Sequence, residues 1–117
     1  MTCVDKSVPG VTVWQMKAAE HMANPTGVVQ GGFVAAFADS AMATSTVTNL
    51  EGRRAYAANT ELKISFIRGA PIGEILSCTA RVIGGGQRVT FVEAEVTDTS
   101  GRLVAKASST YLLTPRD

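Results

Sequence analysis

The clearest periodicity in the chain lies within residues 55–68, where apolar and polar side chains alternate one by one. The apolar positions are Leu62, Ile64 and Phe66, and the polar positions between them are Glu61, Lys63 and Ser65. A period of two is typical of a β-strand that buries one of its faces. We therefore expect residues 55–68 to form a strand with one face against a core.

Four further segments are predicted to be strands. Residues 11–19 mix β-branched and aromatic residues with partial alternation, and the later segments are separated by short turns that contain glycine. The predicted strands span residues 11–19, 55–68, 74–83, 88–98 and 103–113, with turns at 71–73, 84–86 and 99–101. Short connections of this kind favour antiparallel pairing of consecutive strands.

The segment from residue 24 to residue 45 has a different pattern. Its proline and glycines indicate a loop, and from Phe33 onward alanine and other apolar residues recur at spacings of one, three and four, as in a helix. The helix is expected to end between residues 47 and 50, before Glu51-Gly52. Alanines fill its other side, so it should be buried nearly all round. One such helix and about five strands predict an α+β fold in which a curved antiparallel sheet wraps the helix.

Asp39 is the only charged residue in this apolar helix. A buried carboxylate is costly unless it is paired or hydrogen-bonded, so its presence needs a reason. The reason is either structural, with Asp39 bonded to a backbone N–H or an arginine, or chemical. The loop before the helix favours a catalytic role for Asp39, because the N–H groups of Gly31 and Gly32 at a helix N-terminus would stabilise a developing negative charge.

Gly31 and Asp39 are eight residues apart, which corresponds to about 12 Å along an α-helix. One chain cannot easily aim both groups at one atom, whereas two antiparallel copies of the helix could. This geometry predicts a homodimer with composite sites, and a homotetramer is the further expectation. The alternative is a monomer whose own sheet buries the helix, but the edge strand, expected at 62–66 or 88–98, would then need protection.

Composition narrows the class of protein. The length of 117 residues predicts one domain, 1–117, and 45% apolar residues are ordinary for a globular chain. A net charge of +1 gives no reason to expect a nucleic-acid partner. Two cysteines without C-x-x-C spacing fit a reducing compartment. With no signal-peptide pattern and no apolar run of about 18 residues, a cytoplasmic protein without a membrane partner is expected. No motif for a metal or cofactor is present, so neither is expected.

Two motifs in the first half resemble a known family. Asn24-Pro-x-Gly27-x-x-Gln30-Gly31-Gly32, followed by Asp39-Ser40-Ala41, resembles the signature of hotdog-fold acyl-CoA thioesterases of the PaaI-like and 4-hydroxybenzoyl-CoA thioesterase group. Residues 59–113 are similar to that family's run of strands, so the likeness covers about nine-tenths of the chain. It implies a hotdog fold and hydrolysis of the thioester of a small aromatic or medium-chain acyl-CoA, in which coenzyme A is part of the substrate and no separate cofactor is needed.

The resemblance also implies catalytic roles. The Gly31 N–H would bind the oxyanion, and Asp39 of the opposing subunit would act either as nucleophile or as general base on a water. Asn24 matches a position that contacts the nucleophile or water, and is equally an ordinary turn former. Ser40 matches an assisting hydroxyl, and is equally helix filler. Gln30 stands where the family usually has His, and an amide can donate a hydrogen bond but cannot take up a proton.

A set of substrate-binding residues follows from the same resemblance. The family places the pantetheine and nucleotide of coenzyme A against the turn at residues 84–88, where backbone N–H groups and an arginine could hold phosphates. The alternative is a flexible turn with a solvated charge. The expected binding residues are Gly32, Phe33, Asn59, Arg68, Gly86, Gln87 and Arg88, with Val34 and Phe37 beside Phe33 in the acyl pocket.

Gln30 keeps two other functions open. A chain that has the fold without the usual His could bind acyl-CoA and not hydrolyse it. A hotdog dehydratase is a further alternative, but such enzymes pair a catalytic His with the helix acid. His21, the only histidine in the chain, is the single candidate for that role and is otherwise a surface or packing residue.

Overall fold

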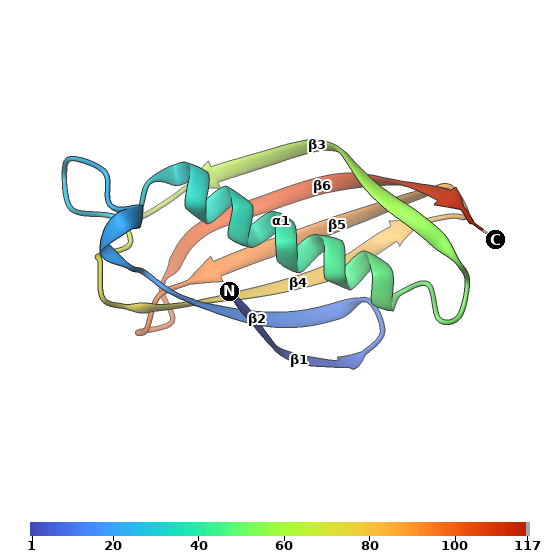
Figure 1. Ribbon diagram of the computed structural model, residues 1–117, viewed down its shortest axis with the longest axis horizontal. Coiled ribbons are helices and arrows are strands. Elements are labelled where there is room, and N and C mark those ends of the chain that lie inside the picture. The colour runs from blue at the N-terminus through green and yellow to red at the C-terminus, as the bar shows by residue number, and fades with distance from the viewer. Residues whose placement is uncertain (117) are drawn as a thin grey trace.

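The computed structural model describes residues 1–116 and shows a curved antiparallel sheet wrapped around one long helix (Figure 1). The elements are β1 Thr2–Val8, β2 Val11–Lys17, the 3-10 helix η1 Glu20–Met22, α1 Gly31–Thr48, β3 Ala55–Phe66, β4 Ile75–Gly85, β5 Val89–Thr97 and β6 Leu103–Pro115. The strand order across the six-stranded sheet is β1-β2-β4-β5-β6-β3. Each predicted strand is present, with ends within two residues of those expected.

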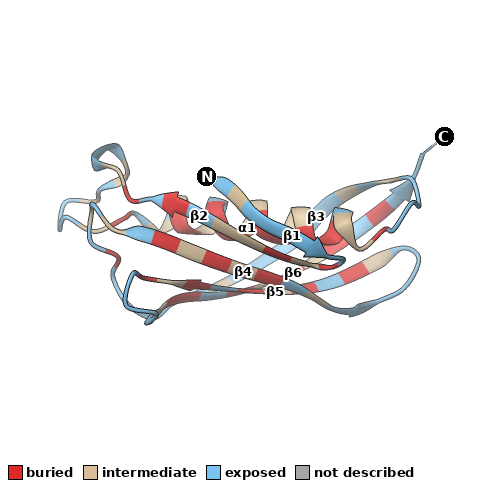
Figure 2. Ribbon diagram, turned by 90° about the horizontal axis from the view of Figure 1, so that it is seen from below, coloured by how far each residue is buried: buried red, intermediate tan, exposed pale blue. Residues whose placement is uncertain are grey.

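The core lies between α1 and the face of the sheet that it crosses. Buried and exposed positions alternate along β4, β5 and β6, as the sequence pattern requires (Figure 2). Phe37, Ala41 and Met42 of the helix have no exposed surface. The buried hydroxyl of Ser45 donates to the Ala80 carbonyl at 3.0 Å and lies 2.8 Å from the Thr12 hydroxyl. This packing confirms the α+β hotdog fold.

The expectation of about five strands is short by one, because β1 precedes the first predicted strand. Six of its seven residues are exposed and none is buried. A strand without a buried face has no reason to alternate apolar and polar residues, so the pattern that reveals the other strands is missing. β1 pairs with β2 through an irregular register, with shifts on both sides of Asp5.

The two edges of the sheet are β1 and β3. The expected edge at residues 62–66 is therefore correct, and the alternative at residues 88–98 is wrong, since β5 lies between β4 and β6. β3 is 12 residues long and mostly exposed, with Tyr56 and Phe66 60% and 55% exposed. A long edge strand with apolar side chains offers unpaired backbone groups to another strand.

Helix α1 is buried on one side only, so the expectation of burial all round is wrong for the single chain. The sheet covers Val34, Phe37 and Ala41, whereas Ala36 and Val47 are exposed on the opposite side. The physical reason is that one curved sheet reaches around only part of a helix. Among residues 1–116, no helix combines the length and the apolar character that crossing a bilayer would require.

Candidate active site

The loop before α1 is built around the side chain of Asn24. Its Oδ1 accepts hydrogen bonds from the backbone N–H of Thr26 at 2.9 Å and of Val28 at 3.3 Å, and from the Thr26 hydroxyl at 2.7 Å. Gly27 follows with φ of +85°, a conformation that favours glycine. The structure thus shows Asn24 as the former of an Asx turn. Its side chain also borders the cavity at the start of the helix.

The helix begins with its first residue pressed against an aromatic ring. Gln30 precedes it and makes no side-chain cap, while its backbone N–H donates to the Met22 carbonyl at 2.8 Å. A Cβ on Gly31 would lie 2.9 Å from Cζ of Phe66, closer than real Cβ contacts. Glycine therefore lets the end of β3 approach the helix N-terminus, where the helix dipole is positive.

A cavity of about 320 Å³ opens at this end of the helix. Gly31, Asn24 and Arg68 share it, although they come from the helix, the preceding loop and the end of β3. The lining residues are Asn24, Val28, Val29, Gly31, Val34, Phe66, Ile67, Arg68, Gly69, Ala70 and Val104. Arg68 is the only charged residue in this lining, and most of the other lining side chains are apolar.

Three of the residues expected in the binding set do not line this cavity. Gly32 is exposed and has open space where a Cβ would be. Phe33 is half-buried and meets His21 edge-on, with ring centroids 5.8 Å apart, so His21 is a packing partner of Phe33. Phe37 is wholly buried in the core and is not among the residues that line this cavity. Val34, three residues earlier, is the helix residue whose side chain reaches the cavity.

Two side chains from the sheet hold the carboxylate of Asp39. The Tyr111 hydroxyl donates to Oδ1 at 2.6 Å, and Nδ2 of Asn59 donates to the same oxygen at 2.9 Å. The Tyr111 hydroxyl also lies 3.1 Å from the Asp39 carbonyl oxygen. The partners are thus a phenol and an amide, in place of the arginine or backbone N–H expected for a structural carboxylate. Ser40 lies beside Asp39, half-buried, and its carbonyl accepts from the Thr44 hydroxyl at 2.9 Å.

A bulge in β3 fixes the orientation of Asn59. The pairing with β6 shifts between Asn59 and Glu61, and the Glu61 N–H donates to Oδ1 of Asn59 at 3.0 Å. With its oxygen engaged, the amide turns Nδ2 toward Asp39 and toward the Ser109 hydroxyl, which it reaches at 3.3 Å. The structure therefore brings Asn59 to the carboxylate rather than to the cavity at the helix start.

Tyr111 is the residue of this cluster that sequence reasoning missed. It is 1% exposed, and burial raises its pKa far above the ordinary value, as do the hydrogen bond to Asp39 and the charge of that carboxylate. The phenol therefore keeps its proton and remains a donor. The signal that could have revealed it is its position in β6, where Tyr111 continues the inward-facing row of Ala105, Ala107 and Ser109. A buried Tyr hydroxyl needs a hydrogen-bond partner, so a polar group opposite it is expected.

Within one chain the expected groups lie in three separate places. Gly31 and Asp39 lie two turns apart on α1, about 12 Å along the axis. The turn with Gly86, Gln87 and Arg88 lies at the opposite end of the sheet from Gly31 (Figure 1), where the Leu113 N–H donates to the Arg88 carbonyl at 2.7 Å. The arginine of that turn and Arg68 are thus at opposite ends of the molecule.

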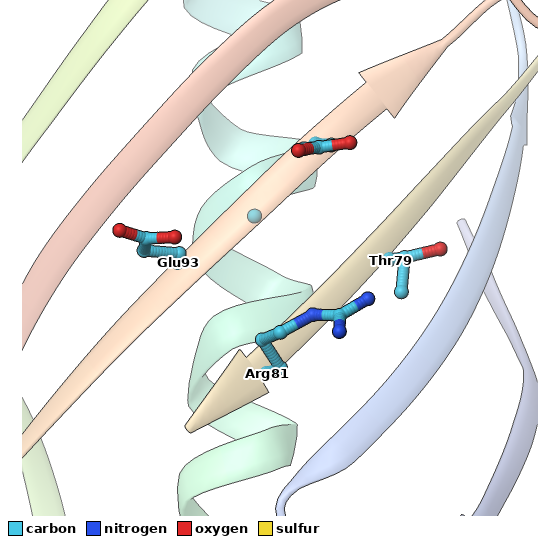
Figure 3. Close-up of a pocket in the computed structure, with 5 residues that line it drawn as sticks. Thr79, Arg81 and Glu93 are labelled. Carbon is cyan, nitrogen blue, oxygen red and sulfur yellow. The ribbon is translucent and has the colours of Figure 1, made fainter. Parts of the chain in front are cut away.

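A smaller hollow lies on the face of the sheet turned away from α1, among Thr79, Arg81 and Glu93 (Figure 3). Its volume of about 30 Å³ is enough for about one water molecule. Lys106 Nζ lies 3.4 Å from a Glu95 carboxylate oxygen and 3.9 Å from one of Glu93. This hollow is part of a surface charge cluster and not a substrate site. Elsewhere in the described chain, no three His, Cys, Asp or Glu side chains are grouped to hold a metal ion.

Comparison with known proteins gives a family match over most of the chain. The model of the thioesterase superfamily matches residues 26–105. Human acyl-coenzyme A thioesterase 13 is 26% identical to this chain over 105 residues, which cover 89% of the chain and 74% of the human protein.

Solved structures share the fold at lower sequence identity. A Streptococcus mutans protein bound to acetyl CoA superposes with a TM-score of 0.89 at 19% identity, covering 97% of this chain and 88% of that one. The PaaI protein of the E. coli phenylacetic acid degradation operon gives a TM-score of 0.82 at 22% identity, covering 92% and 74%. At these identities the likeness shows the fold.

Proposed function

The chain belongs to the thioesterase superfamily, and on that premise we propose that it hydrolyses acyl-CoA thioesters. The observation that carries the proposal is the carboxylate of Asp39, which two donors hold at one oxygen on a helix whose first N–H group borders an apolar cavity. The human relative named as an acyl-coenzyme A thioesterase and the structural neighbour bound to acetyl CoA support this choice of substrate.

The oxyanion donor in this proposal is the backbone N–H of Gly31. It is among the first N–H groups of α1, which have no partner within the helix and lie at the positive end of its dipole. As the thioester carbonyl becomes tetrahedral, its oxygen gains negative charge that such a donor stabilises. Gln30, whose exposed side chain makes no cap, is free to donate a further hydrogen bond from its amide.

Asp39 supplies the second part of the chemistry. Its carboxylate either attacks the thioester carbon and displaces the coenzyme A thiolate, or removes a proton from the water that does so. Ser40, the next residue on the helix, would assist with its hydroxyl. In both routes Asp39 must reach the carbonyl that Gly31 binds, and the separation along one helix requires Asp39 from a second chain.

A homodimer with composite sites meets this requirement, and three features support it. The exposed edge of β3 can pair with the same edge of a second chain. The side of α1 that the sheet leaves open carries small or apolar residues such as Ala36 and Val47. An antiparallel arrangement of two helices would place Gly31 of one against Asp39 of the other. A tetramer would be a pair of such dimers.

The substrate's two ends would be held by different parts of the pair. The apolar lining around Val34 and Phe66 suits a small aromatic or medium-chain acyl group. Arg68 at the border of the cavity, and the turn with Gly86, Gln87 and Arg88, offer backbone N–H groups and cations for the phosphates of coenzyme A. Because that turn is far from Gly31 within one chain, it would act on the site of the second subunit.

Thiol release from a panel of aromatic and aliphatic acyl-CoAs tests the proposal, with the wild type compared with Asp39→Ala. We expect turnover in the wild type and a loss of at least about 1000-fold in kcat for the variant, because the group that attacks or activates water is gone. Circular dichroism and sedimentation show whether the variant keeps its fold and assembly. Binding of acyl-CoA without turnover by the wild type would instead establish a binding protein, in which Gln30 replaces a needed histidine.

A further inference from the structure

Both donors to Asp39 end on the same carboxylate oxygen. Tyr111 Oη lies 2.6 Å from Oδ1 and Asn59 Nδ2 lies 2.9 Å from it, whereas Oδ2 accepts no hydrogen bond from any of residues 1–116. The distance of 2.6 Å is in the range of a hydroxyl donating to an ionised carboxylate, which is among the stronger hydrogen bonds in proteins. One oxygen is thus fixed, and the other is free.

The hydroxyl of Tyr111 is itself held in place. The ring is 1% exposed in β6, and the hydroxyl touches both the carbonyl oxygen and the carboxylate of Asp39, at 3.1 and 2.6 Å. One group that contacts the backbone and the side chain of the same residue limits rotation of that side chain. Asn59 approaches from β3 on a bulge that fixes its amide, so the two donors reach Asp39 from two neighbouring strands of the sheet.

We propose that Tyr111 is a positioning residue of the reaction, which together with Asn59 clamps Oδ1 of Asp39 so that the ionised carboxylate presents Oδ2 to the thioester or to the attacking water. This inference rests on the proposed function and adds to it a residue that the mechanism above does not use. It also separates the roles of the two oxygens: Oδ1 orients the group, and Oδ2 carries the chemistry.

Other ionisable groups do not take part in this clamp. From β4, the thiol of Cys78 faces the helix, and burial raises its pKa to about 12, so it is neutral. Among the other carboxylates on these strands, Glu61 accepts from the Thr110 hydroxyl, and Glu93 and Glu95 lie near Lys106. Lys63 and Arg81 also lie on these strands and are exposed, and neither contacts Asp39 in the described chain. Tyr111 is therefore the titratable side chain that contacts Asp39 in the described chain.

Tyr111→Phe tests the role, with Tyr56→Phe as the matched control. Each variant removes one phenol hydroxyl, but Tyr56 is 60% exposed on β3 and its hydroxyl makes no hydrogen bond within residues 1–116. For Tyr111→Phe we expect kcat to fall about tenfold or more with KM within about twofold, because a transition-state contact is misplaced while substrate binding stays.

A purely structural tyrosine would lower the thermal midpoint and leave both kcat and KM unchanged, and that result would overturn the proposal. If Tyr111→Phe does not fold, Asn59→Ala on the exposed edge strand tests the same clamp, and a kcat at the wild-type value would again overturn the proposal. A wild type without turnover would remove the proposed function and this role with it. An active wild type with a normal Tyr111→Phe variant would remove the role alone.

Discussion

Gly31 has no room for a methyl group, because the ring of Phe66 occupies the place of its Cβ at 2.9 Å. Phe66 is 55% exposed, so its ring can swing outward into solvent when a side chain is added. Substitution at this position therefore displaces a wall of the cavity more than it strains the core.

We predict that Gly31→Ala lowers kcat/KM about tenfold or more while the thermal midpoint changes by only a few degrees, since the helix gains propensity as the ring is displaced. The double variant Gly31→Ala/Phe66→Ala should recover part of the activity, because the added methyl group then meets open space. Kinetics with the best acyl-CoA of the panel and thermal unfolding check both statements. Full activity of Gly31→Ala alone would show that the Phe66 ring does not shape the site.

The residues of the site differ in how far a sequence can predict them. Asp39 stands out as a lone charge in an apolar helix, and Gly31 as a glycine at its start, so local pattern is enough to single them out. Tyr111 lies 72 residues from Asp39, and its partnership depends on the register in which β3 and β6 pair Asn59 with Tyr111. Register depends on the bulge at Asn59, and nothing in the alternating pattern marks that bulge.

Among the elements, the turn between β5 and β6 is organised by one carboxylate. Asp98 Oδ1 accepts the backbone N–H groups of Arg102 and Ser100 at 2.9 Å each, and Nε of Arg102 donates to Oδ2 at 2.9 Å. The backbone N–H of Arg102 and the adjacent guanidinium hold the pKa of Asp98 below its usual range.

A lowered pKa means that the turn stabilises the fold above the ordinary aspartate pKa of about 4, and that this contribution is lost as the pH falls below it. We predict that Asp98→Asn lowers the free energy of unfolding at pH 7 and makes it less dependent on pH between 4 and 2. Urea unfolding across that range measures both effects. A wild-type slope for Asp98→Asn would contradict the assignment.

Most elements that a period of two or a helical period predicts have a buried face. β4 to β6 and α1 follow their patterns, and their ends lie close to the turn residues that bound them. β3 alternates clearly, but its expected packing of one face against a core is found only in part, because Ile64 is half-buried while Leu62 and Phe66 are exposed in the single chain. β1 has no buried residue and no alternation to detect. The sequence predicts burial for the open side of α1 as well, because alanine is found on both covered and uncovered helix surfaces and composition alone does not distinguish them.

At the scale of the whole molecule, activity should depend on assembly into a dimer or tetramer. We predict that the wild type sediments as a dimer or tetramer at micromolar concentration and that Ala36→Glu, on the open side of α1, gives a folded and inactive monomer. A charge placed where two helices meet would be buried without a partner, and monomers cannot bring Gly31 and Asp39 together. Gln15→Glu adds the same charge on β2, on the face away from the helix, and should leave both mass and turnover unchanged. An active wild-type monomer would contradict the composite site.

The irregular strand β1 also bears on how far such an assembly can grow. Its pairing with β2 shifts on both sides of Asp5, and the Asp5 carboxylate accepts a hydrogen bond from the Ser7 N–H at 2.9 Å. Bulges and charged side chains make an edge a poor template for another strand. β1 has two register shifts within 7 residues, whereas β3 has one shift within 12 residues and so offers longer regular stretches. Two chains joined through β3 would expose only β1 at either end of the combined sheet. The protein would thus have one sheet edge that pairs with another chain and one that does not. Strand addition would therefore stop at a dimer and would not continue into a fibre.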